Sequence, residues 1–363
     1  MTKYLIRRLI QAIPVVIGIT IVSYAIMVSA PGGPLQRFAL NPKVTPAETA
    51  RLIRAWGLDQ PIPVQYCRWV GLCDPNQDGV SLLTTHGVPN FLPAALGGGD
   101  NGLLHGDLGF SLDDGQDVGS RIGRAALPTV VLAGTALLIW ILLAIGIGVV
   151  AAVKRYSLFD QVATVFAYVG TALPTFWLGL MLILVFGVSL RWLPISGMVD
   201  ARLSPAFGSD QYWAYFGSHP LGAVVDIGRH LILPVITLVM VNLAADTRFV
   251  RSAMLEAMGQ DYVRTARAKG LSNRTVSFRH VLRNALLPVV TNIGLELPFL
   301  FTGALVTESI FSWPGIGKLT IDATRSFDYT ILMGVLLITA LLVVLANLLA
   351  DVMYAVIDPR IKL

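Results

Sequence analysis

The sequence predicts an all-α integral membrane protein with six transmembrane helices. Hydrophobic residues make up 55% of its 363 residues and charged residues only 13%, whereas about 25% of a soluble globular chain is charged. Six apolar stretches are each long enough to cross a bilayer, which takes about 20 helical residues. Lys and Arg gather in alternate connections between these stretches, so the net charge of +5 informs the orientation of the chain in the membrane. The sequence has no stripe of basic residues interleaved with aromatic ones, the pattern that would indicate binding to nucleic acid.

The six expected spans are separated by polar connections. The first span is too long for the apolar core of a signal peptide, and Pro31 follows Ala30 where cleavage would be needed. We therefore expect an uncleaved anchor at residues 1–30. The spans cover about residues 9–30, 129–153, 161–190, 231–250, 287–311 and 331–357.

Prolines interrupt several of these spans. A proline inside a transmembrane helix frees a carbonyl group, which neighbouring helices can satisfy. The prolines therefore favour bent helices packed as a bundle, although proline is in any case commoner in membrane helices than in soluble ones. They are Pro14, Pro174, Pro234 and Pro298.

Basic residues predict the orientation of the chain. They gather before the first span, between the second and third, between the fourth and fifth, and after the sixth. These four regions share one side in a six-span protein, and the positive-inside rule makes that side cytoplasmic, with both termini inside. The expected organisation is an anchor at 1–30, an extracytoplasmic segment at 31–125, a transmembrane domain at 126–357 and a cytoplasmic tail at 358–363.

The two long outer connections have their own composition. Residues 31–125 are rich in Gly, Pro and Asp, and a capping box at Thr45 to Glu48 predicts a short helix at about 46–56. Residues 191–229 carry several Trp and Tyr side chains, which suit the interface between lipid and water.

Two candidate structural devices lie in the first outer segment. An oxidising compartment favours a disulfide between Cys67 and Cys73, with two free thiols as the alternative. The stretch that begins at residue 74 matches the first half of a calcium-binding loop, with oxygen-bearing side chains at its first, third and fifth positions. The twelfth position, where such a loop has a Glu, is Thr85. A calcium site completed by other residues and an ordinary turn therefore both stay open. The candidate ligands are Asp74, Asn76 and Asp78.

The connection between the fourth and fifth spans, residues 252–286, is long enough to have its own structure and function. Asp261 to Lys269 is a run of good helix formers with an acid at its start and a base at its end, and Gly270 supplies a stop. Ala266 and Ala268 would let the surface of another protein come close, and the flanking Arg and Lys could meet acidic groups on it. The alternative is a merely solvated basic loop.

Further distinctive motifs lie along the chain. They are GDLGFS at 106–111, PTFWLG at 174–179, RHVLRNALLPVVT at 279–291, TESIFSWPGIG at 307–317 and DPRI at 358–361. Together with the 252–286 connection they resemble the permease subunits of the dipeptide and oligopeptide branch of ATP-binding-cassette (ABC) importers, over nearly the whole chain. The wider family has Glu-Ala-Ala, three residues and Gly in its cytoplasmic loop. Here only Ala266 and Gly270 are kept, as is typical of the peptide branch.

The resemblance implies a type I ABC permease fold and a coupling helix that sits in a groove of an ATPase subunit. Closure of the ATPase pair would tilt the permease helices and so alternate access. The residues implied in this contact are Asp261, Tyr262, Arg264, Thr265, Ala266, Arg267, Ala268, Lys269, Gly270 and Leu271. The stretch at about 71–104 looks like an insertion relative to the family.

The resemblance also implies partners and a compartment. These are a second homologous permease, two ATPase subunits that bind ATP and Mg²⁺, an extracytoplasmic substrate-binding protein, and the bacterial inner membrane. The chain has no phosphate-binding loop, because Gly317-Lys318 lacks the rest of the pattern; we expect no cofactor bound directly for transport. Dipeptides or short oligopeptides are the expected substrates, with nickel chelates or another small solute as the alternative.

Acidic residues within the spans suggest a substrate pathway, because ionisable groups at membrane depth are usually functional. Glu296 could meet the amino terminus of a peptide or pair with a neighbouring helix. Glu308, near the outer boundary, would brace the outer gate more than bind substrate. The predicted pathway residues are Glu296, Pro298 and Glu308, and we expect Asp246 to pair with Arg251.

Two other classes of membrane protein remain alternatives. A secondary transporter should show inverted repeats and several charges at mid-membrane, and the sequence shows no clear repeat and few deep charges. An intramembrane enzyme needs a convergent catalytic set such as His-Glu-x-x-His, which is absent from the sequence.

Overall fold

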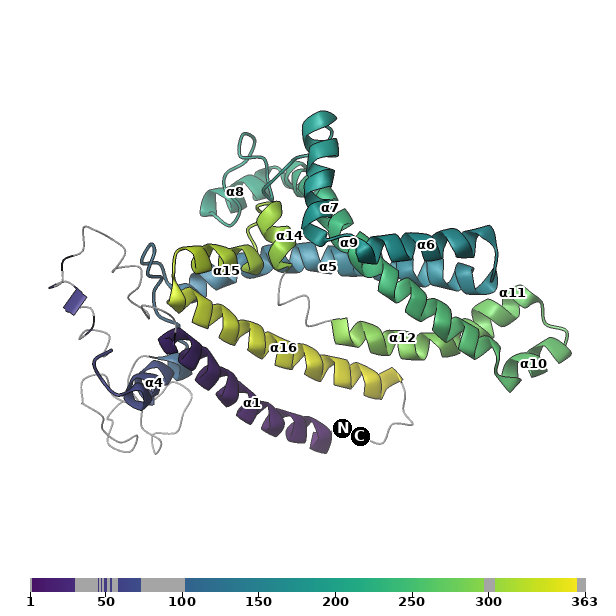
Figure 1. The fold of residues 1–363 in the computed structure, drawn as a ribbon, viewed down its shortest axis with the longest axis horizontal. Coiled ribbons are helices and arrows are strands. Elements are labelled where there is room, and N and C mark those ends of the chain that lie inside the picture. Colours follow the sequence, from purple (N-terminus) through teal and green to yellow (C-terminus); the bar gives the residue numbers. More distant parts are fainter. Residues whose placement is uncertain are drawn as a thin grey trace. The chain divides into compact units, whose positions relative to one another are not determined.

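The chain is mostly helical in the part that the computed structural model describes, namely residues 2–29, 45, 47, 49–50, 53, 58–72, 102–296 and 304–357 (Figure 1). Within these ranges there is no β-strand, only an isolated bridge between Phe110 and Asp117, and the predicted all-α class is confirmed. The helices are α1 (Thr2–Ser29), α4 (Ile62–Val70), η3 (Leu103–His105), α5 (Val118–Val153), α6 (Leu158–Ala172), α7 (Thr175–Leu182), η4 (Ile183–Ser189), α8 (Asp210–Ser218), α9 (Pro220–Met258), α10 (Asp261–Ala268), α11 (Asn273–Thr275), η5 (Val276–Val281), α12 (Leu282–Glu296), α14 (Leu305–Ile310), α15 (Ile316–Arg325) and α16 (Tyr329–Ile357).

Four described helices, α1, α5, α9 and α16, are long and apolar enough to cross a membrane, and a bent pair makes a fifth candidate. The pair is α6 with α7 and η4, and it bends by 101°. The break falls at Leu173 and Pro174, as expected for a residue whose ring excludes the helical conformation before it. The fifth expected span contains α12 and α14, but residues 297–303 lie outside the described part, so the count of six stays a prediction.

Two spanning helices are longer than the apolar pattern predicts. α5 begins at Val118 rather than at Thr129, and α9 runs from Pro220 to Met258 rather than from 231 to 250. Hydropathy marks only the part of a helix that lies in lipid, while backbone hydrogen bonding continues beyond it. Pro220 suits the first turn of α9, where its missing N–H group would have no partner anyway.

The chain divides into two compact units, which are described separately. Unit 1 comprises residues 1–8, 125–318 and 342–363, and unit 2 comprises residues 9–124 and 319–341.

The core of unit 1 is built on α5 and α9. Trp140 of α5 and Leu238 of α9 belong to one buried cluster, which also includes Trp313. Glycines bring the helices close: a Cβ at Gly148 of α5 would lie 2.8 Å from the Val250 side chain, and one at Gly170 of α6 would lie 2.8 Å from a backbone oxygen of α9. Close approach through small residues is the usual means by which helices associate in lipid.

The core of unit 2 is aromatic. α4 packs on α1, where the Thr20 and Tyr66 hydroxyl groups lie 2.8 Å apart and the Tyr24 hydroxyl donates to Gln65 over 3.0 Å. The Tyr24 and Tyr66 rings meet edge to face with centroids 5.6 Å apart, and Met333 of α16 completes the cluster. These contacts hold the end of α1 that leads into the 31–125 segment.

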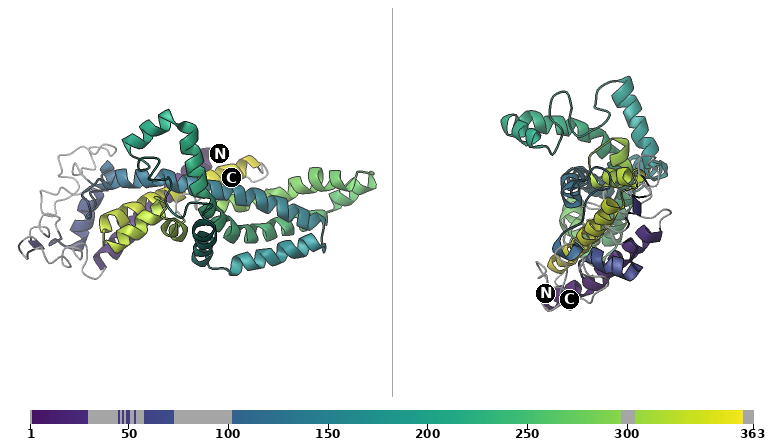
Figure 2. Two further views of the ribbon diagram at one scale, coloured as in Figure 1. Left: turned by 90° about the horizontal axis from the view of Figure 1, so that it is seen from above. Right: turned by 90° about the vertical axis from the view of Figure 1, so that its left-hand side faces the viewer.

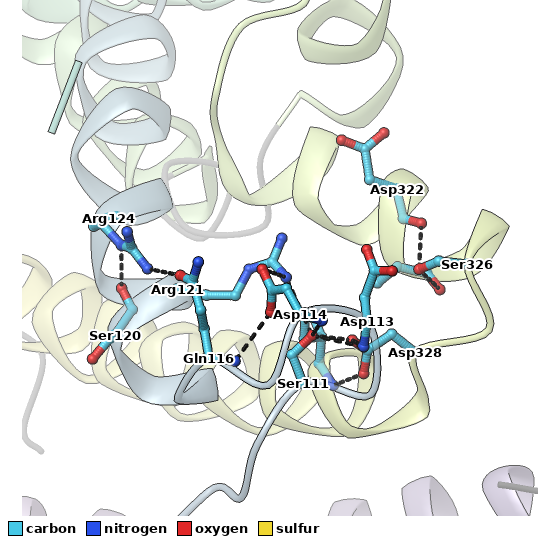
Figure 3. A network of polar contacts seen from close by, with 12 residues as sticks. Ser111, Asp113, Asp114, Gln116, Ser120, Arg121, Arg124, Asp322, Ser326 and Asp328 are labelled. Atoms are coloured by element: carbon cyan, nitrogen blue, oxygen red, sulfur yellow. Dashed lines mark hydrogen bonds and ion pairs between the residues drawn. The ribbon is translucent and has the colours of Figure 1, made fainter. Parts of the chain in front are cut away.

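A polar network in unit 2 ties the GDLGFS motif to the start of α16 (Figure 3). Asp328 is fully buried, and it accepts hydrogen bonds from the Ser111 hydroxyl over 2.5 Å and from the Ile331 amide over 3.2 Å. Arg121 pairs with Asp114 over 3.0 Å. Although burial opposes the effect, hydrogen bonds from Gln116 and Ser111 and the charge of Arg121 hold the pKa of Asp114 below its ordinary value.

Candidate functional site

The predicted coupling segment folds as a separate short helix. α10 extends from Asp261 to Ala268, which confirms the helix expected there to within one residue. Asp261 in its first turn and Arg267 in its last complement the helix dipole. Gly270 follows in a left-handed conformation with φ of 76°, so that its amide and that of Leu271 bond back to the Arg267 and Ala266 carbonyls. The predicted stop at Gly270 is therefore confirmed.

One face of α10 is built into unit 1. Val263 is fully buried and Ala266 is 7% exposed, and both belong to a cluster with Met254 of α9 and Val281 of η5. This cluster also includes Val149 and Ala152 of α5, Val250 and Ala257 of α9, Val276 of η5, and Ala285 and Val289 of α12. Ala266 faces this core, so the expectation that it lets the surface of a partner protein come close is wrong.

The opposite face of α10 is exposed. Arg264 pairs with Asp261 over 3.6 Å, but both side chains lie almost wholly in solvent, where such a pair contributes little. Ala268 is exposed and therefore remains a position at which a second protein could come close. The exposed residues of this face are Asp261, Arg264, Thr265, Arg267, Ala268, Lys269, Gly270 and Leu271.

α10 leads without a long loop into α12. After Gly270 the Ser272 side chain caps α11, and η5 and α12 continue directly to Glu296. Figures 1 and 2 show α10 and α11 together at one end of α9 and α12. η5 is a π-helical turn, which is uncommon and frequently found at functional sites.

Asp246 does not form the expected ion pair with Arg251, and that prediction is wrong. Arg251 instead binds Asp160 of α6 through Nε and Nη2, over 2.7 and 2.9 Å. Positions five apart on a helix lie on different faces, whereas pairs form at spacings of three or four. Arg248 likewise turns to α6, where its guanidinium lies 5.2 Å from the Tyr168 ring centroid.

The Asp246 carboxylate joins three helices of unit 1. Oδ2 accepts a hydrogen bond from Trp140 Nε1 of α5 over 2.9 Å, and Oδ1 accepts one from Asn292 Nδ2 of α12 over 2.9 Å. Sequence reasoning missed both donors, although an Asn and a Trp within apolar spans were a visible signal. A small pocket beside this link is lined by Asp246, Asn292 and apolar side chains that include Phe249.

The structure describes two of the three predicted pathway residues, Glu296 and Glu308. Glu296 lies one turn beyond Asn292 on α12, partly buried, and does not line the pocket. Pro298 lies outside the described residues. The pathway roles of Glu296 and Pro298 stay predictions.

Glu308 is fully buried in a socket made by its own motif. Its Oε1 accepts from the Thr129 hydroxyl over 3.0 Å, and Oε2 accepts from the Gly317 amide over 2.7 Å and the Lys318 amide over 3.2 Å. Those two amides belong to the first turn of α15, where unpaired N–H groups favour an anion. Trp313 Nε1 adds a 2.8 Å hydrogen bond to the Pro128 carbonyl. These contacts brace residues 304–318 against α5.

The candidate calcium ligands Asp74, Asn76 and Asp78 lie outside the described residues. Cys67 lies in α4 and is bonded in a disulfide, but Cys73, the only other cysteine in the sequence, is also outside that part, so their pairing stays a prediction. Of the helix expected at about 46–56, the described positions 47, 49, 50 and 53 are helical.

Apolar spanning helices joined by polar side-chain links, with a short two-faced helix at one end, define a multi-pass membrane protein of the permease class. The chain belongs to the family described as "binding-protein-dependent transport system inner membrane component", whose model matches residues 144–363. The model for the N-terminal membrane component of such systems matches residues 1–78. The chain is thus an inner membrane protein, and a secondary transporter is not favoured.

Similar relatives match this chain from end to end. The oligopeptide transport system permease protein AppB of Bacillus subtilis is 37% identical over 363 residues, covering 100% of both chains. The dipeptide transport system permease protein DppB of Escherichia coli K12 is 36% identical, and the di/tripeptide transport system permease protein DppB of Pseudomonas aeruginosa is 39% identical; each match covers 100% of this chain and 99% of the relative. The resemblance to the peptide branch of ABC permeases is confirmed.

Proposed function

We propose that this chain is the transmembrane permease subunit of an ATP-driven importer for dipeptides or short oligopeptides. The observation that carries the proposal is the two-faced helix α10. Its buried face belongs to the same cluster as α5, α9 and α12, while its other face is exposed and charged. A short rod held in this way can transmit a push from a second protein to the spanning helices.

The partners of the proposal follow from the family. Two ATPase subunits would bind ATP and Mg²⁺, and one of them would receive the exposed face of α10; this chain would hydrolyse no ATP itself. A second, homologous permease would form the other half of the pathway. A substrate-binding protein would deliver the peptide on the extracytoplasmic side, and both termini would be cytoplasmic. The peptide substrate is supported by the names of the three relatives.

Reconstitution of the complete importer tests this function. The chain, its partner permease, both ATPase subunits and the binding protein are placed in liposomes with ATP inside, and uptake of a labelled dipeptide from outside is measured. We expect uptake that requires every subunit and hydrolysable ATP and that stops with vanadate.

Two results would contradict the proposal. One is uptake by the chain alone, without ATPase subunits, and the other is a complete complex that hydrolyses ATP without accumulating any di- or oligopeptide. A nickel chelate offered to the same liposomes is the substrate control, and its uptake in place of peptide would overturn the substrate assignment alone.

A further inference from the structure

The link at Asp246 is unusual for a carboxylate within a spanning helix, because both of its hydrogen bonds come from neutral donors. Trp140 and Asn292 donate to separate oxygens, over 2.9 Å each. Arg248 and Arg251, the nearest cations along α9, contact α6 instead. Among the described residues, Asp246 therefore serves to connect α5, α9 and α12 rather than to neutralise a charge.

Asn292 lies on the face of α12 that continues to the coupling segment. Ala285 and Val289, seven and three positions before it, are buried in the cluster that also holds Val263 and Ala266 of α10. Residues at these spacings share one side of a helix. An unbroken series of contacts therefore leads from α10 along α12 to Asn292, and from there through Asp246 to Trp140.

We propose that Asp246 is a positioning residue for energy coupling, which ties α12 to α5 and α9 so that a displacement of α10 moves the three helices together. The inference rests on the proposed function, because it assumes that α10 receives the ATPase stroke. A carboxylate suits this position because its two oxygens accept from two helices at once. An apolar side chain would offer no acceptor to either donor and would remove both hydrogen bonds that connect α9 to α5 and α12.

The test is the coupling ratio of the reconstituted importer, the number of peptides taken up per ATP hydrolysed. Asp246→Ala removes both hydrogen bonds, and we expect the ratio to fall roughly fivefold or more while binding-protein-stimulated ATP hydrolysis continues. The exchange Asp246→Asn with Asn292→Asp rebuilds both bonds, since the amide then at position 246 accepts from Trp140 and donates to the carboxylate then at position 292. We expect it to restore the ratio to within about twofold of the wild type.

Asn242→Ala is the matched control. Asn242 lies one turn before Asp246 on α9 and is also partly buried, but its amide donates to Leu238 of its own helix over 2.8 Å. This variant removes a polar group and no link between helices, so its ratio should equal that of the wild type. If Asp246→Ala does not assemble with its partners, Trp140→Phe, which removes one donor and keeps an aromatic ring, carries the same test.

The outcomes separate this inference from the function on which it rests. An unchanged ratio in Asp246→Ala, or in Trp140→Phe when that variant carries the test, would overturn the inference. The inference would also be overturned if the exchange variant, Asp246→Asn with Asn292→Asp, assembled with its partners but kept a low coupling ratio. That result would show that the charge at position 246 is required and that the hydrogen-bonded link is not sufficient. Absence of peptide uptake by the wild-type complex would instead refute the proposed function.

Discussion

At the scale of single residues, the Glu308 socket depends on glycines as much as on the carboxylate. Gly317 supplies a backbone amide to Oε2, and Gly315 lies where the Thr129 hydroxyl and the carboxylate come together. A buried carboxylate is tolerated when its oxygens receive hydrogen bonds, and it is strongly destabilising when they do not. The TESIFSWPGIG motif therefore forms one structural unit, in which the glycines allow the backbone to come close to the Glu308 carboxylate.

Gly315→Ala should destabilise the folded chain. The added Cβ would lie 2.5 Å from Thr129 Oγ1, and an overpacked core position of this kind costs about 1–3 kcal/mol. The measurement is the thermal unfolding midpoint of the purified chain in detergent.

Gly228→Ala in α9 is the control for that change, because a Cβ there meets nothing within 4 Å, and alanine favours a helix over glycine by up to about 1 kcal/mol. Its midpoint should be unchanged or slightly raised. Equal midpoints for Gly315→Ala and Gly228→Ala would show that the socket is not tightly packed around Gly315.

At the scale of elements, the two alanines of α10 lie on opposite faces of the helix, one buried and one exposed. Ala266 packs in the core of unit 1, whereas Ala268 is exposed. Sequence reasoning found the helix and its glycine stop, because charge placement and turn chemistry are local signals. It assigned both alanines to a partner, because which side of an eight-residue helix is buried depends on η5 and α12.

A pair of leucine substitutions separates the two faces. Ala266→Leu should lower the stability of the purified chain by about 1–3 kcal/mol, because it overfills the cluster around Val263. Ala268→Leu should leave stability within about 0.5 kcal/mol, since it changes an exposed position, but should reduce the amount of ATPase subunit that co-purifies.

Thermal unfolding and co-purification from detergent check the two effects independently. The proposed contact would be refuted if Ala268→Leu retained a full complement of ATPase subunits with normal coupling.

At the scale of the whole molecule, hydropathy and charge predicted most of the spanning helices and their class. The spans at 129–153 and 231–250 lie within α5 and α9, and Pro174 breaks the third span as expected. The extensions of α5 and α9 beyond the apolar pattern were not predicted, because hydropathy says little about where a helix continues in polar surroundings. The contact between Thr129 and Glu308 and the Asp246 link were missed because each joins residues more than 40 positions apart.

Cysteine labelling tests the predicted orientation. In a chain whose Cys67 and Cys73 are replaced by Ser, Ala268→Cys and Leu221→Cys place single thiols at exposed positions beyond the two ends of the apolar part of α9. A membrane-impermeant maleimide should label position 268 only in inverted vesicles and position 221 in intact cells.

The cysteine-free parent chain measures background labelling. Labelling of position 268 in intact cells would show that the predicted orientation is wrong. It would also refute the assignment of α10 to the ATPase side.

The hydrogen bond from Trp140 to Asp246 gives the protein an intrinsic optical probe. Indole emission responds to a nearby charge and to loss of a hydrogen bond at the ring nitrogen, and Trp140 is only 1% exposed. Subtracting the spectrum of Trp140→Phe from that of the wild type would isolate its signal among the seven tryptophans. Opening and closing of the bundle could then be followed in real time in unlabelled protein.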